Sequence, residues 1–279
     1  MEKKEVVMKV LFLSLVLLSA CSNRGEMPAK HELPENIEEA VESKFRHPNN
    51  KLRDQYRHPI ETLKFFGVEP HMTVVEVNPG SGWYMEILAP LLAKDGRYIM
   101  AAPDMDPTKD YSVKNEKYIN DWKLEYPIVA LKMERIFFSP PKKTQMPEGI
   151  ADMVLTFRNV HNWMGTNGHN DAFEAFYAVL KEGGILGVVE HRAKESNKDP
   201  FAKSGYVRES DVIKMAKAAG FELVEKSEIN ANKKDTTNHP AGVWTLPPTL
   251  RLGEKDKKKY LAIGESDRMT LKFRKPVKE

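Results

Sequence analysis

Two short groups of polar residues each follow an apolar run and could carry chemistry. The hexapeptide RNVHNW, residues 158–163, follows the run IADMVLTF, and the tripeptide EHR, residues 190–192, follows the run ILGVV. Imidazole titrates near pH 6.5, so His161 is the first candidate for a general base and His191 is the second. A single histidine is more often structural, but a mixed polar cluster at the end of a buried strand favours a site.

A third stretch, TVVEVNPGSGWY at residues 73–84, has the order strand, glycine turn, helix. Its valines predict a strand that is buried on both faces, and the apolar spacing of the following residues predicts a helix. Glycines let a ligand approach the backbone, and the free N–H groups at the start of a helix favour polar or anionic atoms. A glycine turn alone is weak evidence, because many strand-to-helix connections need one for geometry.

The phrase EVNPGSGWYMEILAP, residues 76–90, resembles the first motif of class I S-adenosylmethionine (SAM)-dependent methyltransferases, in which the glycine loop wraps the amino-acid part of SAM. The whole phrase is most similar to a bacterial group of predicted, poorly characterised methyltransferases. The phrases RHPIETLKFFGVEP, FRNVHNW, KEGGILGVVEHRA and GESDRM resemble the same group. Together they cover most of the chain after about Leu52.

The resemblance implies SAM as the cofactor, with two departures from the family pattern. Asn78 stands where a glycine is usual, and Ala102 stands where an acidic residue usually binds the ribose hydroxyls. Asp104 is the acid we expect in that role, since two carboxylate oxygens suit two adjacent donors; the alternative is a capping or turn aspartate. The residues expected to bind the cofactor are Glu76, Asn78, Gly80, Ser81, Gly82, Trp83, Asp104 and Asn159.

For a methyl transfer the main task of the protein is to hold nucleophile, methyl group and sulfur in line, with His161 or His191 accepting the proton of the nucleophile. The residues expected to bind the substrate are Asn162, Trp163, Arg192, Arg57 and His58. Trp163 could instead pack in the core, and Arg57 and His58 could instead be surface charge and a helix cap. The GESDRM phrase, residues 264–269, is expected to close the pocket or to form an ion-paired turn.

The expected pocket residues are mixed polar and aromatic, which fits a small-molecule substrate more than a duplex nucleic acid. With 279 residues and 41% hydrophobic content, the chain can build one sizeable core. A net charge of +3 among 30% charged residues is too small for nucleic-acid binding by bulk electrostatics, so no nucleic-acid partner is expected. The single cysteine, Cys21, excludes an intrachain disulfide. The oligomeric state is not predicted.

Residues 1–21 have the pattern of an export signal, with lysines ahead of an apolar stretch at residues 10–18. That stretch is short of the ~20 residues that span a bilayer. The sequence LSAC at residues 18–21 resembles a bacterial lipoprotein cleavage box, which implies lipidation of Cys21 and a membrane anchor facing the periplasm, at the outer membrane. The alternatives are a buried helix or a simple cleaved signal, and Met8 is an alternative start.

Residues 22–50 are polar with three prolines, which predicts a tether with a short helix at residues 35–43. Residues 51–279 form the expected methyltransferase-like domain. The alternation of helix and strand from residue 60 to residue 273 predicts a doubly wound, mostly parallel, seven-stranded Rossmann-like α/β sheet with an antiparallel C-terminal hairpin. Within it we expect a strand over residues 128–138 and a helix over residues 206–219.

Two other functions stay open from the sequence. One is a non-catalytic ligand-binding protein on the same fold, motivated by Asn78, Ala102 and the export signal, because SAM is made in the cytosol. The other is a metal-dependent hydrolase. It is disfavoured, and no metal is expected, because no HExxH or other tight ligand spacing connects the histidines that would form it. Those histidines are His161, His169, His191 and His239.

Overall fold

The computed structural model describes residues 32–142 and 146–278 of the chain. The predicted signal at residues 1–21, with Cys21, lies outside the described residues and stays a prediction. Among the residues that are described, no helix combines the length and the apolar character needed to cross a membrane.

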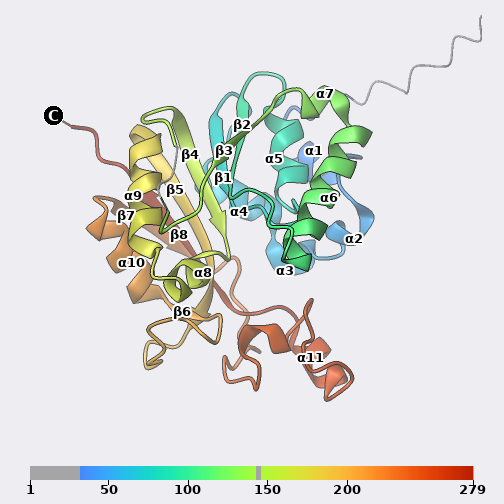
Figure 1. Ribbon diagram of the computed structural model, residues 1–279, viewed down its shortest axis with the longest axis vertical. Coiled ribbons are helices and arrows are strands. Elements are labelled where there is room, and N and C mark those ends of the chain that lie inside the picture. The colour runs from blue at the N-terminus through green and yellow to red at the C-terminus, as the bar shows by residue number, and fades with distance from the viewer. Residues whose placement is uncertain (1–31, 143–145, 279) are drawn as a thin grey trace, which may run out of the picture. The chain divides into compact units, whose positions relative to one another are not determined.

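A mixed eight-stranded sheet forms the centre of the fold (Figure 1). The strands are β1 Thr73–Val77, β2 Arg97–Ala102, β3 Met133–Phe137, β4 Ala151–Phe157, β5 Leu180–Ala193, β6 Val207–Arg208, β7 Glu222–Ser227 and β8 Arg268–Arg274. Their order is β3-β2-β1-β4-β5-β8-β7, with β6 paired to β5. The first five strands are parallel, and β8 is antiparallel to β5 and β7. The predicted sheet with its antiparallel C-terminal pair is confirmed, and β6 is an additional short strand.

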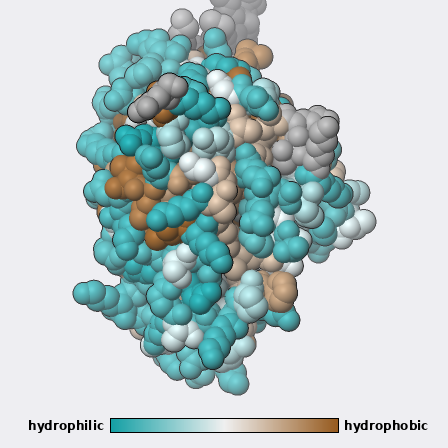
Figure 2. Space-filling model, turned by 90° about the vertical axis from the view of Figure 1, so that its left-hand side faces the viewer, coloured by the Kyte–Doolittle hydropathy of each residue, from teal (hydrophilic) through white to brown (hydrophobic). Residues whose placement is uncertain are grey.

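Helices cover both faces of the sheet (Figure 1). On one side lie α1 Ile37–Glu42, α2 Pro48–Lys51, α3 Asp54–Arg57, α4 Pro59–Phe66, α5 Met85–Leu92, α6 Asp110–Glu125 and α7 Pro127–Ala130. On the other lie α8 Val160–Gly165, α9 His169–Val179 and α10 Glu209–Ala218. The segment between β7 and β8 contains a 3₁₀ turn, Gly242–Thr245, and α11 Lys257–Ile263. Figure 2 shows the face that carries α9, α10 and β7, which is mostly hydrophilic apart from one hydrophobic group.

The apolar strands supply two cores at once. Val74 belongs to the core under α1, α4 and α5, whereas its neighbour Val75 belongs to the core under α8, α9 and α10. On β4, Leu155 and Val154 divide in the same way. Successive side chains of a strand point to opposite faces, so a strand buried on both sides must be apolar throughout. This is why β1 and β4 could be recognised from sequence.

Residues 33–50 are part of the folded domain, which corrects the tether predicted over residues 22–50. The helix expected within residues 35–43 forms as α1 and buries Ile37 and Val41 in the core. The side chain of Asn36 accepts a hydrogen bond from the backbone of Glu39 and caps this helix. The few apolar residues lie on one helical face, so they pack well although the segment as a whole is polar.

Two other predicted elements are shorter than expected. The strand expected over residues 128–138 is limited to β3, because Pro127–Ala130 forms the short helix α7. The helix expected over residues 206–219 begins only at Glu209, because Val207 and Arg208 pair with β5 as β6. At β6, two residues join the sheet through a partner strand that precedes them in sequence, which local periodicity does not reveal.

Candidate functional site

A pocket of about 220 Å³ lies at the carboxyl ends of β1 and β4. The chain order of the sheet reverses between these two strands, and open α/β sheets bind ligands at such a point. Its walls come from α3 with the residue before it, from the turn after β1 and from the turn after β4. The lining residues are Arg53, Arg57, Glu76, Asn78, Pro79, Gly80, Ser81, Trp83, Tyr84, Phe157, Arg158 and Asn159.

The turn after β1 has the backbone of a ligand-binding loop. Asn78, Gly80 and Gly82 all have φ in the left-handed region, at 47°, 61° and 82°. Asparagine tolerates this conformation better than most residues with a side chain, which explains why Asn78 can replace the usual glycine. Its Oδ1 is buried without a hydrogen-bond partner, and a Cβ added to Gly80 would meet no heavy atom within 4 Å. The turn therefore offers an unused acceptor and open space to a ligand.

Asn159 connects the two strands that frame the pocket. Its Nδ2 donates to the carbonyl of Val77 at 3.0 Å and to Oγ1 of Thr156 at 3.2 Å. Arg158, the residue before it, has φ of 64°. A non-glycine residue held in this conformation at a strand end is a common feature of binding sites. Asn159 thus lines the pocket as predicted and also holds the ends of β1 and β4 together.

An aromatic layer supports the pocket. Tyr84 stacks on Phe157 with ring centroids 3.6 Å apart and an angle of 11° between the rings. Trp83 donates from Nε1 to the carbonyl of Asn50 at 3.0 Å, and the guanidinium of Arg57 lies 4.5 Å from its ring centroid. Trp83 is therefore fixed on both sides, as a rigid wall rather than a mobile cover.

Glu76 is the only acidic residue among those lining the pocket. Burial raises its pKa to about 8, although a hydrogen bond from the hydroxyl of Tyr98 at 2.7 Å acts in the opposite direction. A carboxyl group with such a pKa is mostly protonated at pH 7. Glu76 therefore contributes little negative charge to the pocket under neutral conditions.

Arginines dominate the charge of the pocket. Glu265 forms ion pairs with Nε of Arg53 at 2.5 Å, with Nε of Arg57 at 3.6 Å and with Arg268. Burial alone would raise the pKa of Glu265, but the three guanidinium groups hold it well below its ordinary value. The side chain of Arg158 forms no hydrogen bond or ion pair within the described part of the chain.

Arg53 and Arg158 were not among the predicted site residues. Arg158 was visible in the hexapeptide after β4, and the four-residue spacing from Arg53 to Arg57 would place both on one helical face. The GESDRM phrase was expected to close the pocket or to form an ion-paired turn. Its members Glu265 and Arg268 form ion pairs at the pocket but do not line it.

His161 and His191 lie together at the ends of β4 and β5, with ring centroids 5.4 Å apart. His161 Nδ1 lies 3.0 Å from Oε1 of the fully buried Glu190, and His191 Nδ1 lies 2.5 Å from Oγ of Ser266. Burial, the charge of His161 and then the charge of Arg268 lower the pKa of His191 well below its ordinary value. His191 is therefore neutral at pH 7, which is the form that accepts a proton.

The histidine pair adjoins the pocket without lining it. The charges of Arg158 and Arg57, which line the pocket, contribute to the lowered pKa of His191. The segment before β8 also connects the two groups, since Glu265 pairs with the pocket arginines and the next residue, Ser266, contacts His191. The polar groups that follow β4 and β5 in the sequence therefore lie together at the carboxyl ends of these strands.

One combination of these side chains has the composition of a metal site. His161, Glu190 and His191 each offer a ligand atom, and all three atoms lie within 4.8 Å of one another. The four-histidine arrangement of a hydrolase is not formed. His239 pairs with Asp235 at 2.8 Å, and His169 begins α9.

Several residues predicted to bind the substrate have other roles. Trp163 is 3% exposed and packs edge-on against Phe138 and Phe176 in the core. Arg192 is bound by Asp267 at 2.9 Å and by Glu228 at 2.6 Å, so its guanidinium is already paired. Neither Trp163 nor Arg192 lines the pocket, and a core tryptophan or a paired arginine has the same sequence signature as a ligand-binding one.

Four more predicted residues lie outside the pocket lining. Asn162 is exposed on α8, and Asp104 is exposed in the loop after β2. His58 lies at the junction of α3 and α4 with φ of 40°. Gly82 belongs to the turn after β1 without lining the pocket. Of the predicted substrate residues, Arg57 alone lines it.

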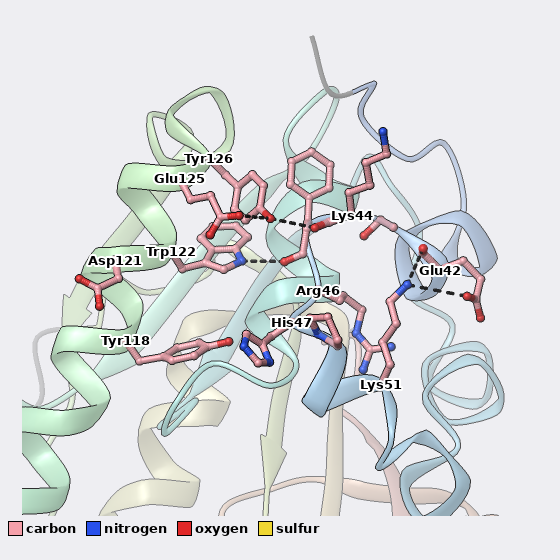
Figure 3. Close-up of a pocket in the computed structure, with 13 residues that line it drawn as sticks. Glu42, Lys44, Arg46, His47, Lys51, Tyr118, Asp121, Trp122, Glu125 and Tyr126 are labelled. Atoms are coloured by element: carbon pink, nitrogen blue, oxygen red, sulfur yellow. Dashed lines mark hydrogen bonds and ion pairs between the residues drawn. The ribbon is translucent and has the colours of Figure 1, made fainter. Parts of the chain in front are cut away.

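A larger cavity of about 580 Å³ lies between the segment of α1 and α2 and the helix α6 (Figure 3). Hydrogen bonds join its walls: Trp122 donates to the carbonyl of Phe45 at 2.7 Å, and Tyr126 donates to the carbonyl of Lys44 at 2.8 Å. The cavity adjoins the smaller pocket through Arg46, which lies 4.9 Å from the ring centroid of Trp83, but none of its lining residues comes from the strand ends or from the turns that follow them. We therefore place the functional site at the smaller pocket.

Comparison with solved structures shows that this fold is the one found in SAM-dependent methyltransferases. A SAM-dependent methyltransferase from Aquifex aeolicus has TM-score 0.54 and 16% identity, covering 84% of this chain and 96% of that one. The [4+2]-cyclase SpnF has TM-score 0.52 and 16% identity, covering 82% and 81%. Human N-acetylserotonin methyltransferase in complex with SAM has TM-score 0.50 and 13% identity, covering 87% and 57%. No family model and no curated protein matches the chain.

The buried carboxyl of Glu76 predicts a pH dependence of stability. Its folded-state pKa of about 8 exceeds the ordinary value of 4.5, so between these pH values the folded chain retains a proton that the unfolded chain releases. The free energy of unfolding should therefore fall as pH rises through this interval, by up to about 1.4 kcal/mol per pH unit. Glu76→Gln should lack this contribution in urea unfolding at pH 5, 6, 7 and 8.

Glu134→Gln is the matched control, because Glu134 is exposed and its pKa is lowered by Arg97. The stability difference between this control and the wild type should not change between pH 5 and pH 8. Parallel pH profiles for Glu76→Gln and the wild type would show that Glu76 is not protonated in the folded state.

Proposed function

We propose that this protein is a SAM-dependent methyltransferase that acts on a small-molecule acceptor. The observation that carries the proposal is the turn after β1, where the unpaired Oδ1 of Asn78 and the open space at Gly80 face a pocket between β1 and β4. The shared fold supports it, as does the resemblance of this stretch to the first methyltransferase motif.

The lining residues fit the amino-acid end of SAM. Asn78 offers an acceptor for an ammonium group, and the hydroxyl of Ser81 offers a donor for a carboxylate. Asn159 also belongs to the polar lining. The pocket is smaller than the ~300–1,000 Å³ of typical small-molecule sites, so we assign only this end of the cofactor to it. Because Ala102 ends β2 and Asp104 lies outside the lining, we expect the ribose to be held without a carboxylate from β2.

SAM, when bound, supplies a methyl group on a sulfonium, which is a good leaving group. The chain must then position the acceptor and remove its proton. His161 suits the second task, because the carboxylate of Glu190 holds its Nδ1 and leaves Nε2 to accept a proton. His191, neutral at pH 7, is the second candidate base. Both lie beside the pocket, so an acceptor extending from it could reach either ring.

A non-catalytic binding protein on this fold is the alternative. It is favoured by the absence of a carboxylate at the end of β2 and by the protonated state of Glu76. The fold does not decide between the two functions, and the similar structure of SpnF is named for a cyclase.

We also propose that the chain is exported and anchored through a lipid on Cys21. Support comes from the sequence of residues 1–21, with its lysines, its short apolar stretch and the motif LSAC. Acyl chains contribute ~0.8 kcal/mol per buried CH₂, so several chains give a firm anchor.

Cofactor binding should depend on the space at Gly80. In Gly80→Leu the added side chain occupies the pocket, so SAM measured by calorimetry should bind at least about tenfold more weakly, in line with ~1–3 kcal/mol for overpacking. Gly253→Leu is the matched control, because Gly253 has the same φ of 61° and open space, outside the pocket. It should strain the backbone equally and leave SAM affinity unchanged. A wild-type protein that binds neither SAM nor its demethylated product would contradict the function.

Catalysis should depend on His161 separately from binding. Using SAM with a labelled methyl group and a bacterial metabolite extract, His161→Gln should reduce label transfer about 10²–10⁴-fold. SAM affinity should stay within twofold of the wild type, because His161 does not line the pocket. His169→Gln, at the start of α9, is the control and should retain transfer. Full transfer by His161→Gln would exclude His161 as the base.

The anchor can be tested in a bacterial host fed labelled palmitate. The wild-type chain should carry label and sediment with the membranes, whereas Cys21→Ser should be unlabelled and should not sediment. Identical labelling and fractionation of the two chains would overturn the anchoring proposal.

A further inference from the structure

We propose that the methyl acceptor is an anionic small molecule whose carboxylate or phosphate group binds the arginine cluster formed by Arg53, Arg57 and Arg158. The identity of the acceptor rests on the proposed methyltransferase function, whereas the anion site rests on the structure of the pocket alone.

The first support is a set of unpaired donors on arginines that line this pocket. Arg57 is 3% exposed; its Nε is ion-paired with Glu265 at 3.6 Å, and its Nη1 makes no hydrogen bond. Nη2 of Arg53 is also buried without a partner. Unsatisfied buried N–H groups are costly, and a charged group more so than a neutral one. A ligand that brings several acceptor oxygens would remove this cost, and carboxylate and phosphate groups match the fork of guanidinium donors.

The arginines are also fixed in place. Arg57 lies over the ring of Trp83, which Arg46 contacts from 4.9 Å. Arg53 is held by Glu265 through Nε, which leaves its Nη2 unused. Donors held in position before binding lose little freedom when a ligand arrives. The cluster is therefore built as a site and not as a set of mobile surface charges.

The second support is the charge balance. Among the residues that the structure describes, Arg53, Arg57 and Arg268 are paired with one carboxylate, that of Glu265, and Arg158 is paired with none, so three positive charges are left without an ion-pair partner. Glu76 does not offset them at pH 7, because its pKa is about 8. Burial, followed by the charges of Arg268 and Arg53, lowers the pKa of Arg158 to about 10, as expected where a cation lacks a counter-charge.

SAM does not supply the missing negative charge. Its carboxylate is accompanied by an ammonium and a sulfonium, so the molecule as a whole is cationic at neutral pH. Bound SAM leaves the surplus positive charge of the cluster in place. An acceptor with its own carboxylate or phosphate would balance that surplus and would also offset the repulsion between the arginines and the sulfonium.

The position of the cluster suits an acceptor that reacts at the histidine pair. Glu265 binds the arginines, and the adjacent Ser266 contacts His191. An acceptor held by its anionic group would then present the rest of the molecule to the pocket edge near His161 and His191. Anchoring of a remote group is an effective way to orient a nucleophile.

The test uses the full chain with inorganic phosphate and citrate as separate probes, in calorimetry at constant ionic strength maintained with chloride. The wild type should bind at least one probe with a single site. Arg158→Gln should weaken that binding at least tenfold. Arg158 is the residue to change because its side chain has no ion pair to break among the described residues. Arginine and glutamine at position 158 both have to adopt the same φ of 64°.

Arg97→Gln is the control for net charge. Arg97 begins β2, so it lies at the amino end of the strand, away from the carboxyl ends that form the pocket, and it pairs with the exposed Glu134 at 2.8 Å. This variant should bind the probe as the wild type does, and thermal unfolding of both variants checks that they fold. Binding of neither probe, or equal binding by the wild type and Arg158→Gln, would overturn the anion site.

A parallel SAM titration separates this proposal from the proposed function. If the probe binds, Arg158→Gln weakens that binding and SAM does not bind, the anion site is supported and the methyltransferase function is excluded. If SAM binds and neither probe binds, the methyltransferase function is supported and the anion site is excluded. Where both bind, the labelled product formed from a metabolite extract should be retained on an anion-exchange resin, and a labelled product that passes through would overturn the acceptor class.

Discussion

The buried carboxylate of Glu265 is the interaction on which the candidate site depends. It binds Arg53, in the N-terminal segment 212 positions away in sequence, and also Arg268, at the start of β8. Removing one partner of a buried charge network leaves the others uncompensated, at a cost of ~3–5 kcal/mol. The pocket arginines therefore assemble only when the N-terminal helices and the last strand are both in place. Residues 33–50 join the domain by a different route, through Ile37 and Val41 in the core.

The parallel sheet brings the remaining groups to the same edge. β1, β4 and β5 are adjacent and parallel, so the residues that follow them emerge together. Asn78 and Arg158 both leave their strands through a left-handed backbone conformation, and both line the pocket. The groups then divide into a ligand-binding set around the turn after β1 and a proton-accepting set formed by His161 and Glu190. The first set includes the stretch that resembles the first motif of class I methyltransferases, and the second comes from the polar groups after β4 and β5.

The sequence predicted the sheet and the turn well because both depend on local patterns. Valine runs identify β1, and the glycine turn identifies most of the cofactor lining. The arginine cluster could not be predicted in the same way, since Arg53, Arg158 and Glu265 meet only through tertiary folding. Trp163 illustrates a second limit of sequence prediction. A tryptophan after a core strand looks the same in sequence whether it stacks on a ligand or packs in the core, as Trp163 packs on Phe176. Residues that could carry chemistry were recognised from local sequence, whereas the residues they contact in the folded protein were not.

The most direct measurement is a crystal structure of the protein grown with S-adenosylhomocysteine. The amino-acid end of the ligand should lie against residues 78–81, and the rest of the molecule should extend along the carboxyl ends of the strands. Density for the ligand only in the larger cavity beside α6, or a turn closed by the protein's own side chains with no ligand bound, would contradict the placement of the site.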